Sequence, residues 1–209
     1  MATPAPPTKK GRETRDRIVA AASRLIFEDG VAGTSLDDVR AAANVSKSQL
    51  YHYFADKDDL VHAVIYRTVQ GVLDAQPRLD DLSSWTAIRA WLDDLVRLQD
   101  ERGAIGGCPI GGLAGQLAER DEVAREELAD GFARWEAPLR AGLEQMRTAG
   151  KLRSSADPDR LATATLAAIQ GGLVLTQTRR DPGQLRIALD AAYTYLRTFT
   201  PEGSSRGVT

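Results

Sequence analysis

Apolar residues recur every three or four positions along nearly the whole chain, which is the spacing of one face of an α-helix. No convincing two-residue alternation of the kind that predicts a β-strand interrupts this pattern. We therefore predict an all-α fold of about nine helices. The expected helices cover residues 12–29, 35–43, 47–53, 57 onward, 84–102, 109–118, 121–148, 158–179 and 183–199.

Helix-ending and helix-starting residues support these boundaries. Gly30 stands where a glycine that ends the first helix is expected. Residues 157–158 and 181–182 both read Asp-Pro, a capping aspartate followed by a proline at the first helical position, and residues 108–109 (Cys-Pro) repeat this logic. Pro138 lies inside a helical pattern, so we expect it to kink or divide that helix.

The pattern divides into a small N-terminal unit and a larger helical body. We expect the first unit to cover residues 11–56 and the second to cover residues 57–199. Residues 1–10 are rich in proline and residues 200–209 in glycine, serine and threonine, which predicts disordered tails.

Composition places the protein in the cytoplasm. No apolar run reaches the roughly 20 residues of a membrane span, the N-terminus lacks a signal-peptide core, and one cysteine cannot form an internal disulfide. The net charge of −2 excludes a generally basic surface, but Lys9, Lys10, Arg12, Arg15 and Arg17 crowd the beginning. This basic end indicates a local anionic partner, or else an ordinary solvated helix face.

Residues 34–57, "TSLDDVRAAANVSKSQLYHYFADK", predict two short helices joined by a tight turn. Asn44 in the turn tolerates left-handed geometry. Apolar side chains can form a small shared core, which leaves the polar residues of the second helix facing outward. A helix-turn-helix presents its second helix to the major groove of DNA in this way.

The run from Phe27 to Leu60, "F-x-x-x-G…T-S-L-x-D-V…A-N-V-S-K-S-Q-L-Y-H-Y-F-x-D-K-x-D-L", resembles the N-terminal domain of the TetR family of transcriptional regulators and covers nearly all of it. The resemblance implies a homodimer on a partly palindromic operator in double-stranded DNA. It also implies a groove-facing role for Lys47, Ser48, Gln49 and His52. Tyr51 would contact a phosphate or a thymine methyl group. The full set of DNA candidates is Thr34, Ser35, Ser46, Lys47, Ser48, Gln49, Tyr51, His52, Tyr53 and Lys57.

Some of these candidates have another interpretation. Gln49 stands three residues after Ser46 and completes a capping box, which competes with a base contact. Thr34, Tyr53 and Lys57 would hold phosphates, but Tyr53 also fits the core and Lys57 fits a solvated surface.

The body, by the same resemblance, holds a small-molecule effector and dimerises through its last two helices. Residues 161–175 are apolar nearly all round, so more than one side must be covered. A two-fold four-helix interface explains this burial, and an intramolecular core is the alternative. The candidate interface residues are Leu161, Ile169, Leu173, Leu185, Leu189, Ala192 and Leu196.

A mostly apolar cavity with one polar group is expected between the central helices, and it favours a neutral or hydrophobic effector. Plain hydrophobic core is an equally good reading of each aromatic residue. The candidate pocket residues are Tyr66, Trp91, Cys108, Phe132, Trp135 and Gln170.

No constellation for catalysis is visible. The two histidines and the cysteine have no metal-ligand spacing, and the carboxylates are scattered over helix surfaces. We expect no enzyme activity, no cofactor and no metal. The function predicted is a homodimeric repressor released from its operator by a small molecule; the alternative is a helical small-molecule-binding protein or a thiol-based electrophile sensor.

The thiol alternative rests on Cys108 in "GGCPIGGLAG". No lysine follows these glycines in the phosphate-loop pattern and no strand precedes them, so the segment is not expected to be a phosphate loop. The segment is similar to one found in a TetR subgroup with some thiol sensors, although Gln116 departs from the acidic residue common there. A cysteine at a helix N-terminus is more acidic than a free one, but a buried structural thiol is the competing reading.

Overall fold

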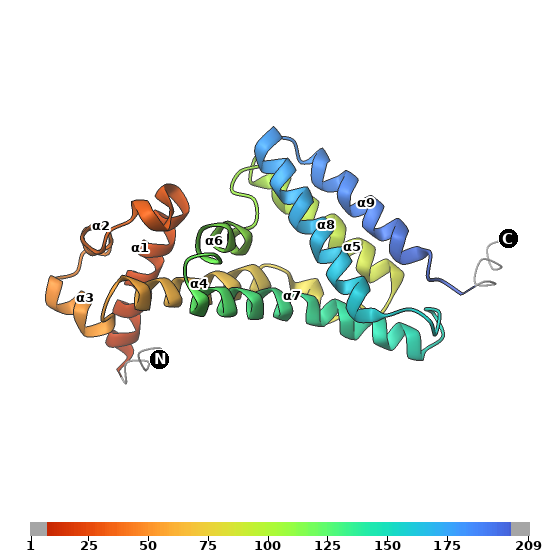
Figure 1. Ribbon diagram of the computed structural model, residues 1–209, viewed down its shortest axis with the longest axis horizontal. Helices are drawn as coiled ribbons and strands as arrows, with labels where there is room; N and C mark the ends of the chain where they lie inside the picture. Colours follow the sequence, from red (N-terminus) through yellow and green to blue (C-terminus); the bar gives the residue numbers. More distant parts are fainter. Residues whose placement is uncertain (1–7, 202–209) are drawn as a thin grey trace. The chain divides into compact units, whose positions relative to one another are not determined.

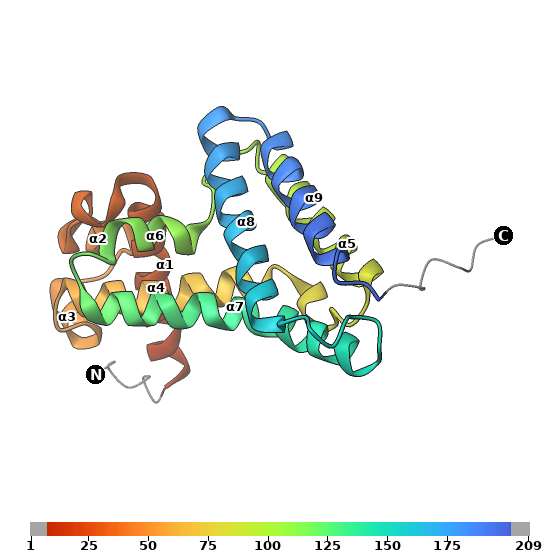
Figure 2. The same ribbon diagram turned by 45° about the vertical axis from the view of Figure 1, so that its right-hand side comes forward.

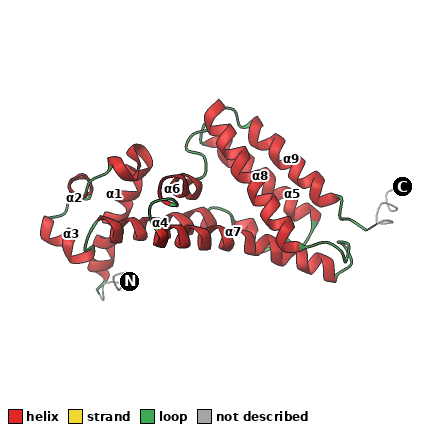
Figure 3. Cartoon of the chain, in the orientation of Figure 1, coloured by secondary structure: helices red, strands yellow, loops and turns green. Residues whose placement is uncertain are grey.

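The computed structural model describes residues 8–201, and in this part of the chain helices and loops account for the whole structure (Figure 3). The all-α prediction is confirmed. The described residues form one short 3₁₀-helix, η1 (Pro77–Asp80), and nine α-helices: α1 (Lys9–Gly33), α2 (Leu36–Ala42), α3 (Lys47–Tyr53), α4 (Lys57–Asp74), α5 (Trp85–Glu101), α6 (Pro109–Leu117), α7 (Glu122–Thr148), α8 (Pro158–Arg179) and α9 (Gly183–Arg197).

Helix α1 begins earlier than the sequence pattern predicts. Thr8 caps it by accepting a hydrogen bond from the Gly11 amide at 3.1 Å, so Lys9 and Lys10 are helical rather than part of a tail. Gly30 interrupts the helix with φ of 77°, a conformation that residues with a Cβ rarely adopt. Most of the two predicted tails, residues 1–7 and 202–209, lies outside the described residues.

The Asp-Pro signal is confirmed at the start of α8, but at α9 Pro182 takes the cap position that was expected for Asp181, and the helix begins at Gly183. Asp157 accepts hydrogen bonds from the amides of residues 159 and 160 and caps α8. Asp181 accepts one from the Gly183 amide at 2.9 Å, and α9 begins there, just after Pro182. Pro138 does not divide α7, which runs unbroken from Glu122 to Thr148.

The chain forms two compact units. The first contains the described residues up to Val72 together with Pro109–Gly131; the second contains Leu73–Cys108 and the described residues from Phe132 onward. Thus α6 and residues 122–131 of α7 pack with the N-terminal helices. The functional boundary at residue 57 stays a prediction.

Within the first unit, α4 and α7 run side by side (Figures 1 and 2). A Cβ added to Gly131 would lie 2.6 Å from a methyl carbon of Val69, so the glycine permits the close approach. His62 on α4 and Glu127 on α7 are joined by a contact of 2.9 Å between Nδ1 and Oε2. A packed pair of helices therefore supports the N-terminal domain.

Within the second unit, α8 and α9 pack closely, with α5 alongside α9 (Figure 1). A Cβ on Gly172 would lie 3.1 Å from the Leu185 Cα, and the Leu185 amide donates to the Thr176 hydroxyl at 3.0 Å. The guanidinium of Arg89 on α5 pairs with Asp190 on α9 at 2.5 Å. The small residues of α8 thus let two helix backbones approach within one chain.

The seven side chains predicted to form the dimer face are internal instead. Each is at most 8% exposed in the single chain, because α8 and α9 cover one another. The intramolecular alternative applies to these residues, and any interface made by the two helices must use other side chains. The corrected residues are Leu161, Ile169, Leu173, Leu185, Leu189, Ala192 and Leu196.

Candidate nucleic-acid interface

Two capping boxes start the two short helices of the predicted DNA-binding motif. The Ser35 hydroxyl accepts from the Asp38 amide at 3.2 Å, and the Asp38 carboxylate accepts from the Ser35 amide at 3.0 Å. Ser46 and Gln49 repeat this exchange at 3.1 and 2.9 Å. Helices of seven residues are marginal alone, so these caps supply partners for amides that would otherwise have none.

The turn between the helices has the geometry that its sequence predicts. Asn44 adopts a φ of 51°, and the Ala43 carbonyl accepts a hydrogen bond from the Arg17 guanidinium at 3.0 Å. Val45, Leu50 and Phe54 are buried beneath the motif. The turn and this small core hold α3 in one orientation relative to α1 and α2.

One face of α3 remains open to solvent. The Lys47 ammonium lies 6.0 Å from the centre of the Tyr51 ring, within range of a cation–π contact. No Asp or Glu stands on α3, so no carboxylate on the helix repels a phosphate backbone. The predicted DNA residues that are exposed at α3 are Ser46, Lys47, Ser48, Gln49, Tyr51 and His52.

The residues predicted to contact phosphates at the edges of the motif differ in exposure. Thr34 is 4% exposed and its hydroxyl donates to the Gly30 carbonyl at 2.9 Å, so its one donor hydrogen is already used inside the protein. This corrects the prediction for Thr34. Ser35 is exposed, but its hydroxyl donates to the Asp38 carboxylate. This hydrogen bond lowers the pKa of the Asp38 carboxyl group. Tyr53 and Lys57 are half-buried.

Comparisons with known proteins agree with this geometry. Residues 18–64 match the family model for bacterial regulatory proteins of the TetR family. Residues 84–191, which are more than half of the chain, match the C-terminal domain of LmrA/YxaF-like transcriptional regulators. The chain belongs to the TetR family of transcriptional regulators.

Relatives of this TetR-family regulator match along most of its length. It is 28% identical to a helix-turn-helix transcriptional regulator in the lacX 3′ region of Lactococcus lactis, over 86% of this chain and 91% of that protein. It is 27% identical to the transcriptional repressor DhaR of a Mycobacterium species, over 80% and 84%. A TetR regulator from Chloroflexus aurantiacus shares its fold, with a TM-score of 0.79, 27% identity and coverage of 92% and 98%.

Membership of the family indicates the general kinds of partner. TetR regulators bind DNA operators, typically form homodimers and typically respond to small-molecule effectors. They are generally not enzymes. Among residues 8–201, no cluster of His, Cys, Asp and Glu side chains has the makings of a metal site, and no described helix is long and apolar enough to cross a membrane.

The predicted effector-pocket residues of the regulator do not converge on one hollow. Trp91 and Trp135 are buried in the second unit, and both indole N–H groups donate to Oε1 of the Gln76 side chain, at 3.0 and 3.1 Å. Sequence reasoning missed Gln76, which follows a helix end and has no periodic signal. Tyr66 is 67% exposed on α4, and Phe132 is half-buried. The two tryptophans therefore belong to a hydrogen-bonded core.

The remaining two pocket candidates differ in character. Gln170 on α8 keeps its Nε2 buried without a hydrogen-bond partner among the described residues, which fits a polar group awaiting a ligand. Cys108 is buried and lies directly before α6. A thiol that solvent and reagents cannot reach reacts slowly, so the burial of Cys108 does not favour the thiol-sensor alternative.

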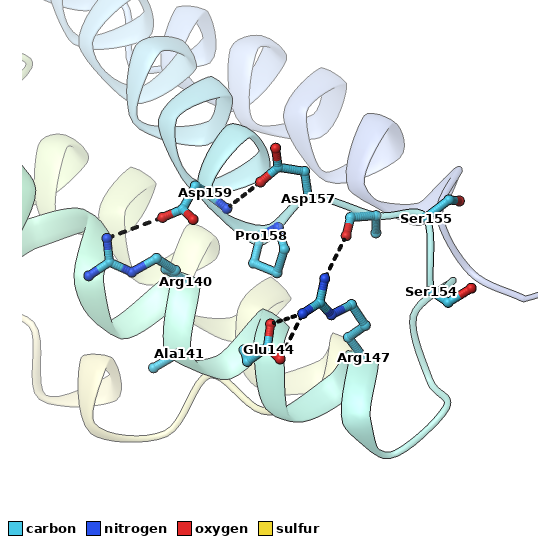
Figure 4. A pocket seen from close by; sticks show the side chains of 10 residues that line it. Arg140, Ala141, Glu144, Arg147, Ser154, Ser155, Asp157, Pro158 and Asp159 are labelled. Carbon is cyan, nitrogen blue, oxygen red and sulfur yellow. Dashed lines mark hydrogen bonds and ion pairs between the residues drawn. The ribbon is translucent and has the colours of Figure 1, made fainter.

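A polar hollow of about 500 Å³ lies elsewhere on the second unit, between the end of α7 and the start of α8 (Figure 4). Its charged side chains pair with one another: Arg140 with Asp159 at 3.2 Å, and Arg147 with Glu144 at 2.8 Å. None of the predicted pocket residues lines it. It is not the apolar cavity that the sequence suggests.

Proposed function

We propose that this regulator is a homodimeric repressor that reads a partly palindromic operator through α3 of each protomer. The observation that carries the proposal is the exposed polar face of α3, which is capped at its start and braced from beneath by a small core. DhaR, a relative of similar length, is named a repressor, which supports repression rather than activation.

A small-molecule effector in the helical body is the proposed release signal. Gln170, whose buried Nε2 has no partner in the described part of the chain, is the best-supported contact, and Cys108 and Phe132 of the same unit remain proposed contacts. Because α4 starts at Lys57, directly after the DNA-binding motif, a change in its tilt would alter the separation of the two α3 helices. DNA and effector would then favour different spacings, and each would weaken the binding of the other.

The test is DNA binding by the full chain and by variants of α3. We expect fluorescence anisotropy to show tighter binding to the protein's own promoter region than to random duplex. Lys47→Ala and Tyr51→Ala should each weaken this binding about tenfold or more, because each removes a contact to DNA. The dimer, measured by sedimentation, should persist.

Lys151→Ala is the matched control, since it removes one exposed lysine outside the DNA-binding motif. Its affinity should equal that of the original protein. Equal binding to promoter and random duplex would disprove sequence-specific regulation through this site.

A further inference from the structure

The capping box of α3 fixes which way the Gln49 amide faces. The side-chain Oε1 accepts a hydrogen bond from the Ser46 backbone N–H at 2.9 Å, while the Ser46 hydroxyl accepts one from the Gln49 backbone N–H at 3.1 Å. An adenine is read by glutamine through both amide atoms at once, Oε1 accepting from N6 and Nε2 donating to N7. Since Oε1 already accepts a hydrogen bond at the start of its own helix, Nε2 is the side-chain atom left to contact a base.

Lys47, in the same first turn of α3, also carries only donors. Lys47 is exposed, its ammonium is held beside the Tyr51 ring, and it has no ion pair among the described residues. An ammonium carries three donor hydrogens and no acceptor. Cytosine is read through its N4 donor by a carboxylate, and α3 has no Asp or Glu to accept from it.

Guanine alone presents two acceptors, O6 and N7, on its major-groove edge. We infer that Lys47 and Gln49 donate to guanine, so that each operator half-site carries guanine where these two side chains meet the groove. This inference rests on the proposed function. It makes Gln49 a residue that both caps α3 and selects the base, rather than one or the other.

The first part of the test is selection from random duplex DNA with the full-length protein. We expect an enriched half-site that contains guanine. Replacing that guanine by 7-deazaguanine, which lacks the N7 acceptor, should weaken binding about tenfold. Inosine, which keeps O6 and N7 and loses only the minor-groove amino group, is the matched control and should bind nearly as well as guanine.

The second part assigns the loss to the two side chains. Gln49→Glu keeps an acceptor for the Ser46 amide, as Asp38 does for Ser35 in α2, but has no donor. Its helix content, by circular dichroism, should be unchanged. In Gln49→Glu and in Lys47→Ala the loss of affinity caused by 7-deazaguanine should shrink severalfold. Once the donor has been removed, removing its acceptor costs little more.

The outcomes separate this inference from the proposed function. If selection enriches no sequence, the protein is not a sequence-specific regulator. If it enriches a half-site without guanine, or if the 7-deazaguanine penalty stays full in both variants, regulation stands and the guanine assignment is wrong.

Discussion

Gln76 shows how one buried amide can organise a core. It is 7% exposed, and its single carbonyl oxygen accepts from Trp91 and Trp135, which come from two helices. Two large side chains thereby bury their apolar rings without leaving an indole N–H unpaired. A buried donor without an acceptor costs about 1–3 kcal/mol.

Gln76→Leu should therefore lower the free energy of unfolding by about 2–5 kcal/mol, because two indole donors lose their acceptor while the volume is nearly kept. Urea unfolding at a fixed protein concentration measures the change. Gln145→Leu, on the exposed side of α7, should stay within about 0.5 kcal/mol. Equal losses in the two variants would show that the indole hydrogen bonds contribute nothing.

The sequence predicts the structural roles of some single residues and not of others. Ser46, Gln49 and Asn44 are placed correctly because caps and turns are local, set within three residues. Thr34 is misplaced because its hydroxyl is claimed by a carbonyl of the preceding turn. Gln76 is missed because its partners lie 15 and 59 residues away.

Contacts between elements depend on glycines that no periodicity identifies. Gly142 on α7 faces the chain after η1, and a Cβ there would lie 2.3 Å from the backbone oxygen of Leu82. A backbone atom cannot move aside as the end of a side chain does, so the element and the loop would have to separate.

Gly142→Ala should lower the free energy of unfolding by about 1–3 kcal/mol, despite the higher helix propensity of alanine. Gly71→Ala on α4 is the matched control, because an added Cβ there meets nothing within 4 Å. That variant should be neutral or more stable by up to about 1 kcal/mol. A gain from both substitutions, in the same urea titration, would rule out the close contact at Gly142.

The helices themselves follow closely from the sequence, since their starts are marked by Ser, Asp and Pro and their faces by apolar spacing. Pro138 is the exception: its position predicts a kink or a division, and α7 is not divided there. Tertiary packing along both ends of α7 can hold a helix together across one missing backbone hydrogen bond.

At the scale of the whole molecule, periodicity cannot say what covers an apolar face. The regularly spaced apolar residues of α9 are buried inside the chain. Other large hydrophobic side chains remain exposed: Val174 and Leu175 on α8, and Ile187 and Tyr195 on α9. Large exposed apolar side chains on adjacent helices are typical of a protein interface. We propose them as the dimer contacts in place of the internal seven.

Ile187, 66% exposed on α9, is the sharpest test of that surface. Ile187→Glu should shift the protein from dimer to monomer in sedimentation velocity, because two-fold symmetry places a charge from each protomer in one apolar interface. Operator affinity should fall by tenfold or more, since two linked half-site contacts become independent. Val123→Glu alters another exposed apolar residue, 55% exposed on α7, and should leave the dimer intact. A dimer that survives Ile187→Glu while Val123→Glu dissociates would place the interface on α7 instead.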